Sequence, residues 1–195
     1  MPTDESGTAD TWNFEEAQVA IDDNNNVHAM WMGSDNMPYY AYSRDNGGSW
    51  SEAMMIAPPI GLAGTGFPVV TAGSDGRVAF GYVGDTGNQT WHGYMTVLTD
   101  AFSDNPLFTT VQVNLPDDPI DSSNAYPEGC GYERCGGLGD FLDMAVDQYG
   151  RPWFSLANND AGEIGIFATI AEGPALRGSL QELAPMPLGG AATLR

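Results

Sequence analysis

The sequence predicts an all-β fold in which short antiparallel strands form the blades of a β-propeller. The main observation is a pattern that occurs three times, at 18–32, 68–82 and 141–155: an apolar run, a turn of Asp, Asn or Gly residues, and a second apolar run. No stretch keeps the apolar period of about 3.6 residues that marks a helix, and 25 glycines and 13 prolines interrupt the chain. Strand-rich repeats of about 50 residues are typical of propeller blades.

Each repeat begins with a β-hairpin. The three turns align at Asn25, Gly76 and Gly150, which are 51 and 74 residues apart. The second spacing is longer because an extra segment lies between the second and third hairpins. We predict about three four-stranded blades, at 14–60, 66–114 and 141–183, with a long loop at 115–140 and a tail at 184–195.

Further strand-like segments follow the hairpins in order. They predict a third strand in each blade, at 39–43, 91–97 and 164–170, and a fourth strand in the second blade at 108–113. The alternative is an ordinary β-sandwich, which would require the likeness of the three hairpins to be a coincidence. We therefore favour blades.

The charge of the chain excludes two classes of partner. There are 26 acidic residues against six basic ones, all of them arginine, which gives a net charge of −20. Such a field repels nucleic-acid phosphates and anionic lipid surfaces. No apolar run approaches the length that crosses a bilayer, so we expect neither nucleic acid nor membrane as a partner. The acidity serves either solubility at high salt or the binding of cations.

Two cysteines bear on the compartment. Cys130 and Cys135 are flanked by glycines, which favours a local disulfide and an oxidising, extracellular location. A zinc site would need two more ligands, and His28 and His92 are distant in sequence. Asn88 begins a glycosylation acceptor pattern. The N-terminus lacks the features of a signal peptide, so either the protein stays inside the cell or the chain is a mature or excised piece of a longer one. We predict a secreted or cell-surface protein.

One motif follows directly after a predicted strand. Residues 43–50 read Ser-Arg-Asp-Asn-Gly-Gly-Ser-Trp and match the pattern Ser-x-Asp-x-Gly-x-Thr-Trp, with serine in place of threonine. We expect Asp45 to accept hydrogen bonds from the amides of its own turn, and Gly47 to adopt a backbone conformation that other residues avoid. We expect Trp50 to fold back and pack against the blade. The motif positions are Ser43, Asp45, Gly47, Ser49 and Trp50.

With this motif the chain resembles the sialidase-like propellers that carry Asp-boxes, also called bacterial neuraminidase repeats, over residues 14–170. The segment 139–151 is also similar to a stretch that recurs in secreted sialidase-like proteins. The resemblance implies a six-bladed ring, of which this chain would form about three blades. It implies less about function, because Asp-boxes occur in sialidases, other glycosidases, sorting receptors and binding scaffolds.

The resemblance also implies a catalytic set that can be sought here. Sialidases of this family bind the substrate carboxylate with three arginines, and they use a tyrosine nucleophile assisted by a glutamate together with an aspartate as acid/base. Arginine suits a carboxylate because its planar fork donates two parallel charged hydrogen bonds. We expect most arginines of this chain on the face opposite to that site or in the tail, namely Arg44, Arg77, Arg151, Arg177 and Arg195. Only Arg134 is left for the site, so we predict no catalytic residues in this chain alone.

The loops between second and third strands repeat acidic and amide side chains. The predicted binding residues on this face are Asp35, Asn36, Asp85, Arg134, Asn158 and Asp160, and the long loop adds Asp117, Asp118, Asp121, Glu128 and Glu133. Such oxygen-rich loops would bind Ca²⁺ or sugar hydroxyls, or would simply form turns. We expect the strand aromatics Trp31, Tyr82 and Trp153 to belong to the core.

These observations predict a secreted, non-catalytic propeller module that recognises a glycan or glycoprotein or serves as a scaffold. The alternatives are a portion of an exo-sialidase or other glycoside hydrolase, whose arginines and Tyr/Glu pair lie outside this chain, and a structural component of the cell surface. Three blades leave strand edges and apolar faces open, which proteins cover or pair. We expect further blades, a partner chain or a second copy to close the propeller.

Overall fold

The computed structural model describes residues 17–87, 90–122, 142–158, 160, 164–170 and 174–177. These residues form eleven strands in three antiparallel sheets, connected by turns and without a helix. The predicted all-β fold is therefore confirmed. No helix in this part of the chain has the length and apolar character needed to cross a bilayer.

The three sheets follow one another along the chain. The first has the order β1 (Gln18–Ile21), β2 (Val27–Met32), β3 (Pro38–Ser43), β4 (Met54–Met55). The second has the order β5 (Gly64–Ala72), β6 (Val78–Asp85), β7 (Trp91–Leu98), β8 (Phe108–Gln112). The third consists of β9 (Asp143–Val146), β10 (Pro152–Asn158) and β11 (Ile164–Thr169), with β10 in the middle. The strands fall within the predicted blade ranges except that β5 begins earlier, at Gly64.

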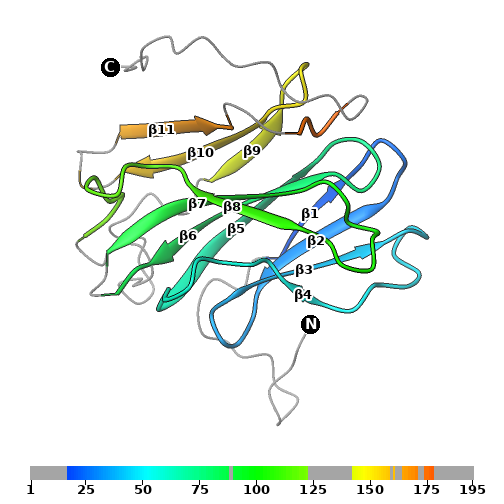
Figure 1. Ribbon diagram of the computed structural model, residues 1–195, viewed down its shortest axis with the longest axis horizontal. Helices are drawn as coiled ribbons and strands as arrows, with labels where there is room; N and C mark the ends of the chain where they lie inside the picture. The colour runs from blue at the N-terminus through cyan, green and yellow to red at the C-terminus, as the bar shows by residue number, and fades with distance from the viewer. Residues whose placement is uncertain are drawn as a thin grey trace, which may run out of the picture.

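The sheets are stacked in series around their first strands (Figure 1). Strand β5 lies against β1 and β2 on one side and against β9 on the other. Sheets that pack face to face in sequence order, with their first strands adjacent, have the arrangement of successive blades of a β-propeller. A sandwich has two sheets with one core between them, whereas here two separate cores lie between three sheets.

The three hairpin turns have the same conformation. The backbone has a positive φ at Asn25, Gly76 and Gly150, of 64°, 68° and 85°. The same backbone hydrogen bond closes each turn, from Asp22 N to Asn26 O, from Gly73 N to Arg77 O, and from Asp147 N to Arg151 O. The predicted alignment of the repeats is therefore also a structural equivalence, because this left-handed conformation is open to Gly and Asn at little cost.

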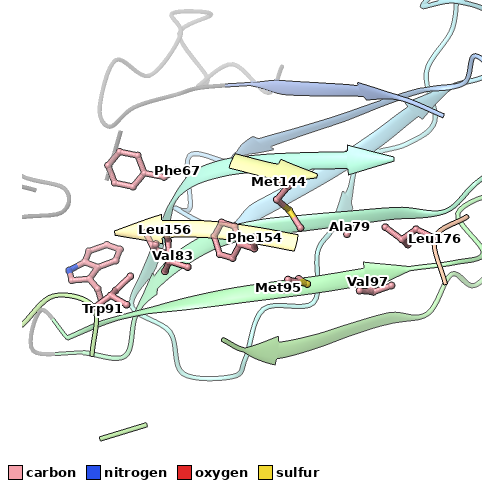
Figure 2. Packing of buried hydrophobic residues seen from close by; sticks show 11 residues of the cluster. Phe67, Ala79, Val83, Trp91, Met95, Val97, Met144, Phe154, Leu156 and Leu176 are labelled. Atoms are coloured by element: carbon pink, nitrogen blue, oxygen red, sulfur yellow. The ribbon is translucent and has the colours of Figure 1, made fainter. Parts of the chain in front are cut away.

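The middle sheet is covered on both faces. On one side Phe80, Tyr82 and Leu98 pack against Met30 and Tyr40 of the first sheet. On the other side, Val83 and Met95 pack against Phe154 and Leu156 of the third sheet (Figure 2). All residues of β7 are buried as a result.

Two glycines allow the third sheet to approach closely. A Cβ atom added to Gly81 would lie 2.7 Å from the ring of Phe154, and one added to Gly93 would lie 2.7 Å from Leu156. Larger side chains at these positions would push the two sheets apart, because core contacts this short leave no room for a methyl group.

Of the three aromatics expected in the core, only Tyr82 is fully buried. Trp31 and Trp153 are partly exposed, which corrects the prediction for these two. Each lies in the second strand of its sheet, but on the face turned away from the middle sheet.

Leu98→Ala should lower the free energy of unfolding by about 2–5 kcal/mol, because it removes a fully buried side chain from the core between the first and second sheets. The matched control is Leu107→Ala, since Leu107 is 71% exposed and its substitution should change stability by less than about 0.5 kcal/mol. Urea denaturation measures both. Equal effects for the two leucines would show that the core is not where we place it.

Candidate functional site

The predicted binding loops gather at one end of the three sheets, which we call the loop end. It contains the β2–β3, β6–β7 and β10–β11 connections (Figure 1). Two links hold them together. Thr65 N, in β5, donates to Asn36 O over 2.8 Å, and Ser122 N donates to Asp160 Oδ1 over 3.1 Å. The backbone of Asp121, next to Ser122, pairs with Trp91 at the start of β7.

In the first of these loops the polar residues serve the loop itself. Asp35 Oδ1 accepts the amide of Met37 at 3.1 Å, and Oδ2 accepts the hydroxyl of Tyr39 at 2.8 Å, which raises the pKa of Tyr39. Asn36 has a positive φ of 58°, and its carbonyl accepts both the amide and the hydroxyl of Thr65. These two residues therefore shape the loop and attach it to the second sheet.

In the second loop, β6–β7, the carboxylate also serves the loop itself. Asp85 Oδ1 accepts the amides of Gly87 and Thr90 at 2.8 and 3.1 Å. In the third loop Asn158 is buried at the end of β10, while Asp160 is exposed and accepts the amide of Ser122. Asp35 and Asp85 therefore form turns, which is one of the alternatives that the sequence left open.

Several predicted residues lie outside the described residues, namely Arg134, Cys130, Cys135, Glu128 and Glu133. In the long loop, Asp117 and Asp118 are exposed and Asp121 is buried. Within the described ranges, no three His, Cys, Asp or Glu side chains are grouped in a way that could hold a metal ion.

The four arginines that the structure describes lie at the other end of the sheets, which we call the turn end. Arg77 and Arg151 are buried beside the hairpin turns, and Arg77 Nη1 donates to Ala175 O over 2.9 Å. The Arg44 guanidinium lies 4.6 Å from the ring centroid of Phe102, a cation–π contact. Arg177 follows Leu176, which is hydrogen-bonded to the third turn. None of the four is at the loop end.

The motif at 43–50 forms a compact, exposed turn between β3 and β4. Asp45 Oδ1 accepts the amide of Ser49 and the hydroxyl of Ser43, both at 2.8 Å, and Oδ2 accepts the hydroxyl of Ser49 at 2.6 Å. The bonds from Ser49 and Ser43 lower the pKa of Asp45 to about 2. Gly47 has a φ of 88° and donates its amide to Ser43 Oγ. Asp45 thus accepts bonds from its own turn.

Trp50 does not behave as expected. Its side chain is 48% exposed, whereas we expected it to pack against the blade. Residues 44–50 are all exposed, and Trp50 belongs to neither of the two cores.

The sequence did not reveal a buried polar chain in the first sheet. His28 Nε2 lies 3.2 Å from Asp22 Oδ2, and His28 Nδ1 lies 2.7 Å from Tyr40 Oη. All three residues are buried. Because an ionised carboxylate only accepts, we assign the ring proton to Nε2, and Nδ1 then accepts the hydroxyl of Tyr40. Burial lowers the pKa of His28, although Asp22 opposes this shift.

Asp22 also joins two sheets. Its Oδ2 accepts the amide of Gly76, in the turn of the second sheet, at 3.0 Å. Asn26 Nδ2 donates both to Asp22 Oδ2 and to Asp75 Oδ1 over 2.8 Å. Burial alone would raise the pKa of Asp22, but the hydrogen bonds from Asn26, Gly76 and His28 lower it to about 2. The group is structural, because it is shielded from solvent and all of its polar atoms are engaged.

The third sheet repeats this turn. Asp147 Oδ1 accepts the amides of Tyr149 and Arg151, as Asp22 Oδ1 accepts those of Asn24 and Asn26. Asp147 Oδ2 accepts the indole N–H of Trp153 at 3.2 Å, at the position that His28 occupies in the first sheet. An aspartate three residues before the left-handed turn residue is the sequence signal that would have found both sites.

No protein-family model matches the chain, and no curated protein matches it. Among solved structures, the chain is similar to the Hadza microbial sialidase Hz136, with 17% sequence identity and a TM-score of 0.48. The match covers 79% of this chain and 30% of that one, so the chain spans less than a third of the length of that sialidase.

Asp22→Asn should make the protein less stable at neutral pH, because an amide NH₂ would face the donors of Asn26 and Gly76. In the folded wild type the pKa of Asp22 is about 2, whereas the ordinary pKa of an aspartate is 3.8. As the pH falls, the unfolded chain takes up this proton first, so stability is lost between about pH 4 and pH 2. One such carboxylate accounts for about 2 kcal/mol. Guanidinium denaturation across this range should show a smaller pH-dependent loss in the variant than in the wild type.

The control for this experiment is Asp104→Asn, which alters an exposed carboxylate. It should keep the pH dependence of the wild type. If Asp22→Asn kept it as well, Asp22 would not be the carboxylate that couples folding to acid.

Asp45→Ala should lower the melting temperature and speed amide exchange at Ser49, because the turn loses the carboxylate that accepts three hydrogen bonds, from Ser43 Oγ, Ser49 N and Ser49 Oγ. Glu52→Ala is the matched control, since Glu52 is an exposed carboxylate in the same β3–β4 connection. Calorimetry and hydrogen exchange measure the two variants. The same melting temperature for Asp45→Ala as for the wild type would argue against this role.

Proposed function

We propose that this chain is a secreted, non-catalytic module of a sialidase-like propeller, which recognises or scaffolds other molecules. The observation that carries the proposal is the position of the arginines. The four described arginines lie at the turn end, so within the described residues the exposed carboxylates of the loop end have no arginine beside them.

The charges of the loop end favour some ligands over others. Asp35, Asp117, Asp118 and Asp160 are exposed there, in a chain of net charge −20. A sialoside carries a carboxylate, which this field repels and which needs arginine for tight binding. Neutral sugar hydroxyls and basic segments of a glycoprotein fit the same surface better. A recognition role is therefore better supported than sialoside hydrolysis.

The turn at Asp45 supports the assignment to Asp-box propellers without adding a site. Its serine and aspartate side chains are used within the turn. We regard it as a structural clamp at the edge of the first sheet.

The extracellular location rests on the sequence. We propose a disulfide between Cys130 and Cys135, which would give the unreduced protein a mass two hydrogens below that of the reduced form. Two freely alkylated thiols in the native protein would contradict it.

The purified chain should not cleave a fluorogenic sialoside above the buffer rate, because the four arginines that the structure describes lie away from the loop end, where they cannot bind the substrate carboxylate together. Cleavage that is lost on Arg134→Ala would contradict the proposal and favour the alternative, a portion of a glycoside hydrolase.

A glycan array tests the recognition role, with neutral and sialylated glycans compared on the same protein. We expect neutral glycans to be preferred at least tenfold. The double variant Asp117→Asn, Asp118→Asn alters the loop end, and Asp104→Asn, in the β7–β8 connection, is its control. A preference for sialylated glycans, or equal effects of the two variants, would contradict the role of the loop end.

A further inference from the structure

The first sheet has a mostly apolar face that is turned away from the second sheet and is exposed along β1. Because side chains alternate along a strand, the register of β1–β4 places one set of residues on the face turned away from the second sheet. These residues are Val19, Ile21, Val27, Ala29, Trp31, Tyr39, Ala41, Ser43 and Met55, and we call this set the outward face. It contains no charged side chain. Val19 and Ile21, in β1, are 63% and 62% exposed, whereas Ala41 and Ser43, in β3, are buried.

The same face is covered in the other two sheets. The positions two, four and six residues after the turn residue are Val27, Ala29 and Trp31 in the first sheet, Val78, Phe80 and Tyr82 in the second, and Pro152, Phe154 and Leu156 in the third. In the second sheet all three are fully buried against the first sheet. In the third sheet, Phe154 and Leu156 are buried against the second. The outward face is therefore the position at which a preceding sheet packs.

The third sheet presents the other half of the same junction. Its face away from the second sheet carries Trp153, Ser155 and Phe167, and Phe167 is 61% exposed. The equivalent residues of the first sheet, His28 and Met30, are buried against the second sheet. Asp143, at the first position of β9, is the charged residue of this face and lies at its rim.

The hydrogen bonds at the turns also indicate that the third sheet presents one half of a junction. Asp22 Oδ2 accepts an amide from the turn of the next sheet, at Gly76. Asp147 holds its own turn in the same way, and within the described ranges its Oδ2 binds only Trp153. The acceptor that joins the first sheet to the second is thus present on the third sheet, with room for one more donor.

We infer that the outward face of the first sheet packs against the β9–β11 sheet of a second copy, in the order in which sheets pack within the chain. The inference rests on the interpretation of the sheets as blades. A second copy fits because one chain carries both halves of the junction. Two copies related by a two-fold axis would form it twice and leave neither half open. The interface is apolar while each copy has a charge of −20, so salt should strengthen it by screening the long-range repulsion.

Light scattering and sedimentation of the full chain, at about 0.05 M and about 1 M salt, test the inference. We expect a mass of twice 20.8 kDa at high salt and a smaller dimer fraction at low salt. A monodisperse species of 20.8 kDa at both salts would overturn the inference, whether or not another protein binds the same face. The sialoside and glycan assays do not depend on this result, so the two proposals fail separately.

Paired variants test which surfaces meet. Val19→Glu with Ile21→Glu charges the outward face, and Phe167→Glu charges the third sheet. Because these side chains are exposed, each protein should remain folded, which circular dichroism checks, and each should lose the dimer. Ile60→Glu, at a residue that is fully exposed and outside both faces, should leave the dimer fraction unchanged.

Mixing the two face variants separates the proposed packing from the self-pairing of one face. Each variant retains the half-junction that the other has lost, so the equimolar mixture should recover a species of twice 20.8 kDa with one intact junction. A dimer that survives Phe167→Glu, or no recovery on mixing, would contradict the head-to-tail arrangement.

Discussion

The middle sheet depends on neighbours at both of its faces. Tyr82 and Leu98 are buried because the first sheet covers them, and Val83 and Met95 are buried because the third sheet does. Each sheet of four strands or fewer has too little core of its own to be stable alone, so its stability comes from face-to-face packing. For the same reason, the sheets follow one another in space in the order in which they occur along the chain. A sheet face without a neighbouring sheet is a surface on which another sheet can pack.

Hydrogen bonds at the turns hold this packing in register. In the first and third hairpins, backbone amides beside the left-handed residue donate to an aspartate, Asp22 or Asp147, and Asp22 extends the contact to Gly76 of the next sheet. Ionised aspartate is well suited to this position because it accepts several amides at once. The arginines near these turns are occupied by the fold. The side chains at the turn end therefore serve the structure, and we propose the loop end as the surface for recognition.

Local signals in the sequence predicted the three hairpins and the third strand of each sheet, but they did not locate β4. The turns at Asn25, Gly76 and Gly150 could be aligned because their conformation favours Gly and Asn whatever surrounds them. The chain from Asp22 through His28 to Tyr40 could not be predicted, since it depends on the register of β2 against β3. The prediction that Trp50 packs against the blade was wrong for a related reason, because the burial of its side chain depends on which residues lie above the turn. For Asp35 and Asp85, spacing predicted a shared end of the sheets, but it could not show that each carboxylate is occupied by its own loop.

The dependence of the middle sheet on both neighbours is most directly measured by native-state amide hydrogen exchange. The amides of β6 and β7 should be the slowest in the chain and should exchange only when the whole protein unfolds. Those of β1 and β11, at the two ends of the stack, should exchange faster through local opening. If β6 and β7 exchanged as fast as β1 and β11, or if the three sheets opened independently of one another, the sheets would not be stabilised by packing in series, and the account would be wrong.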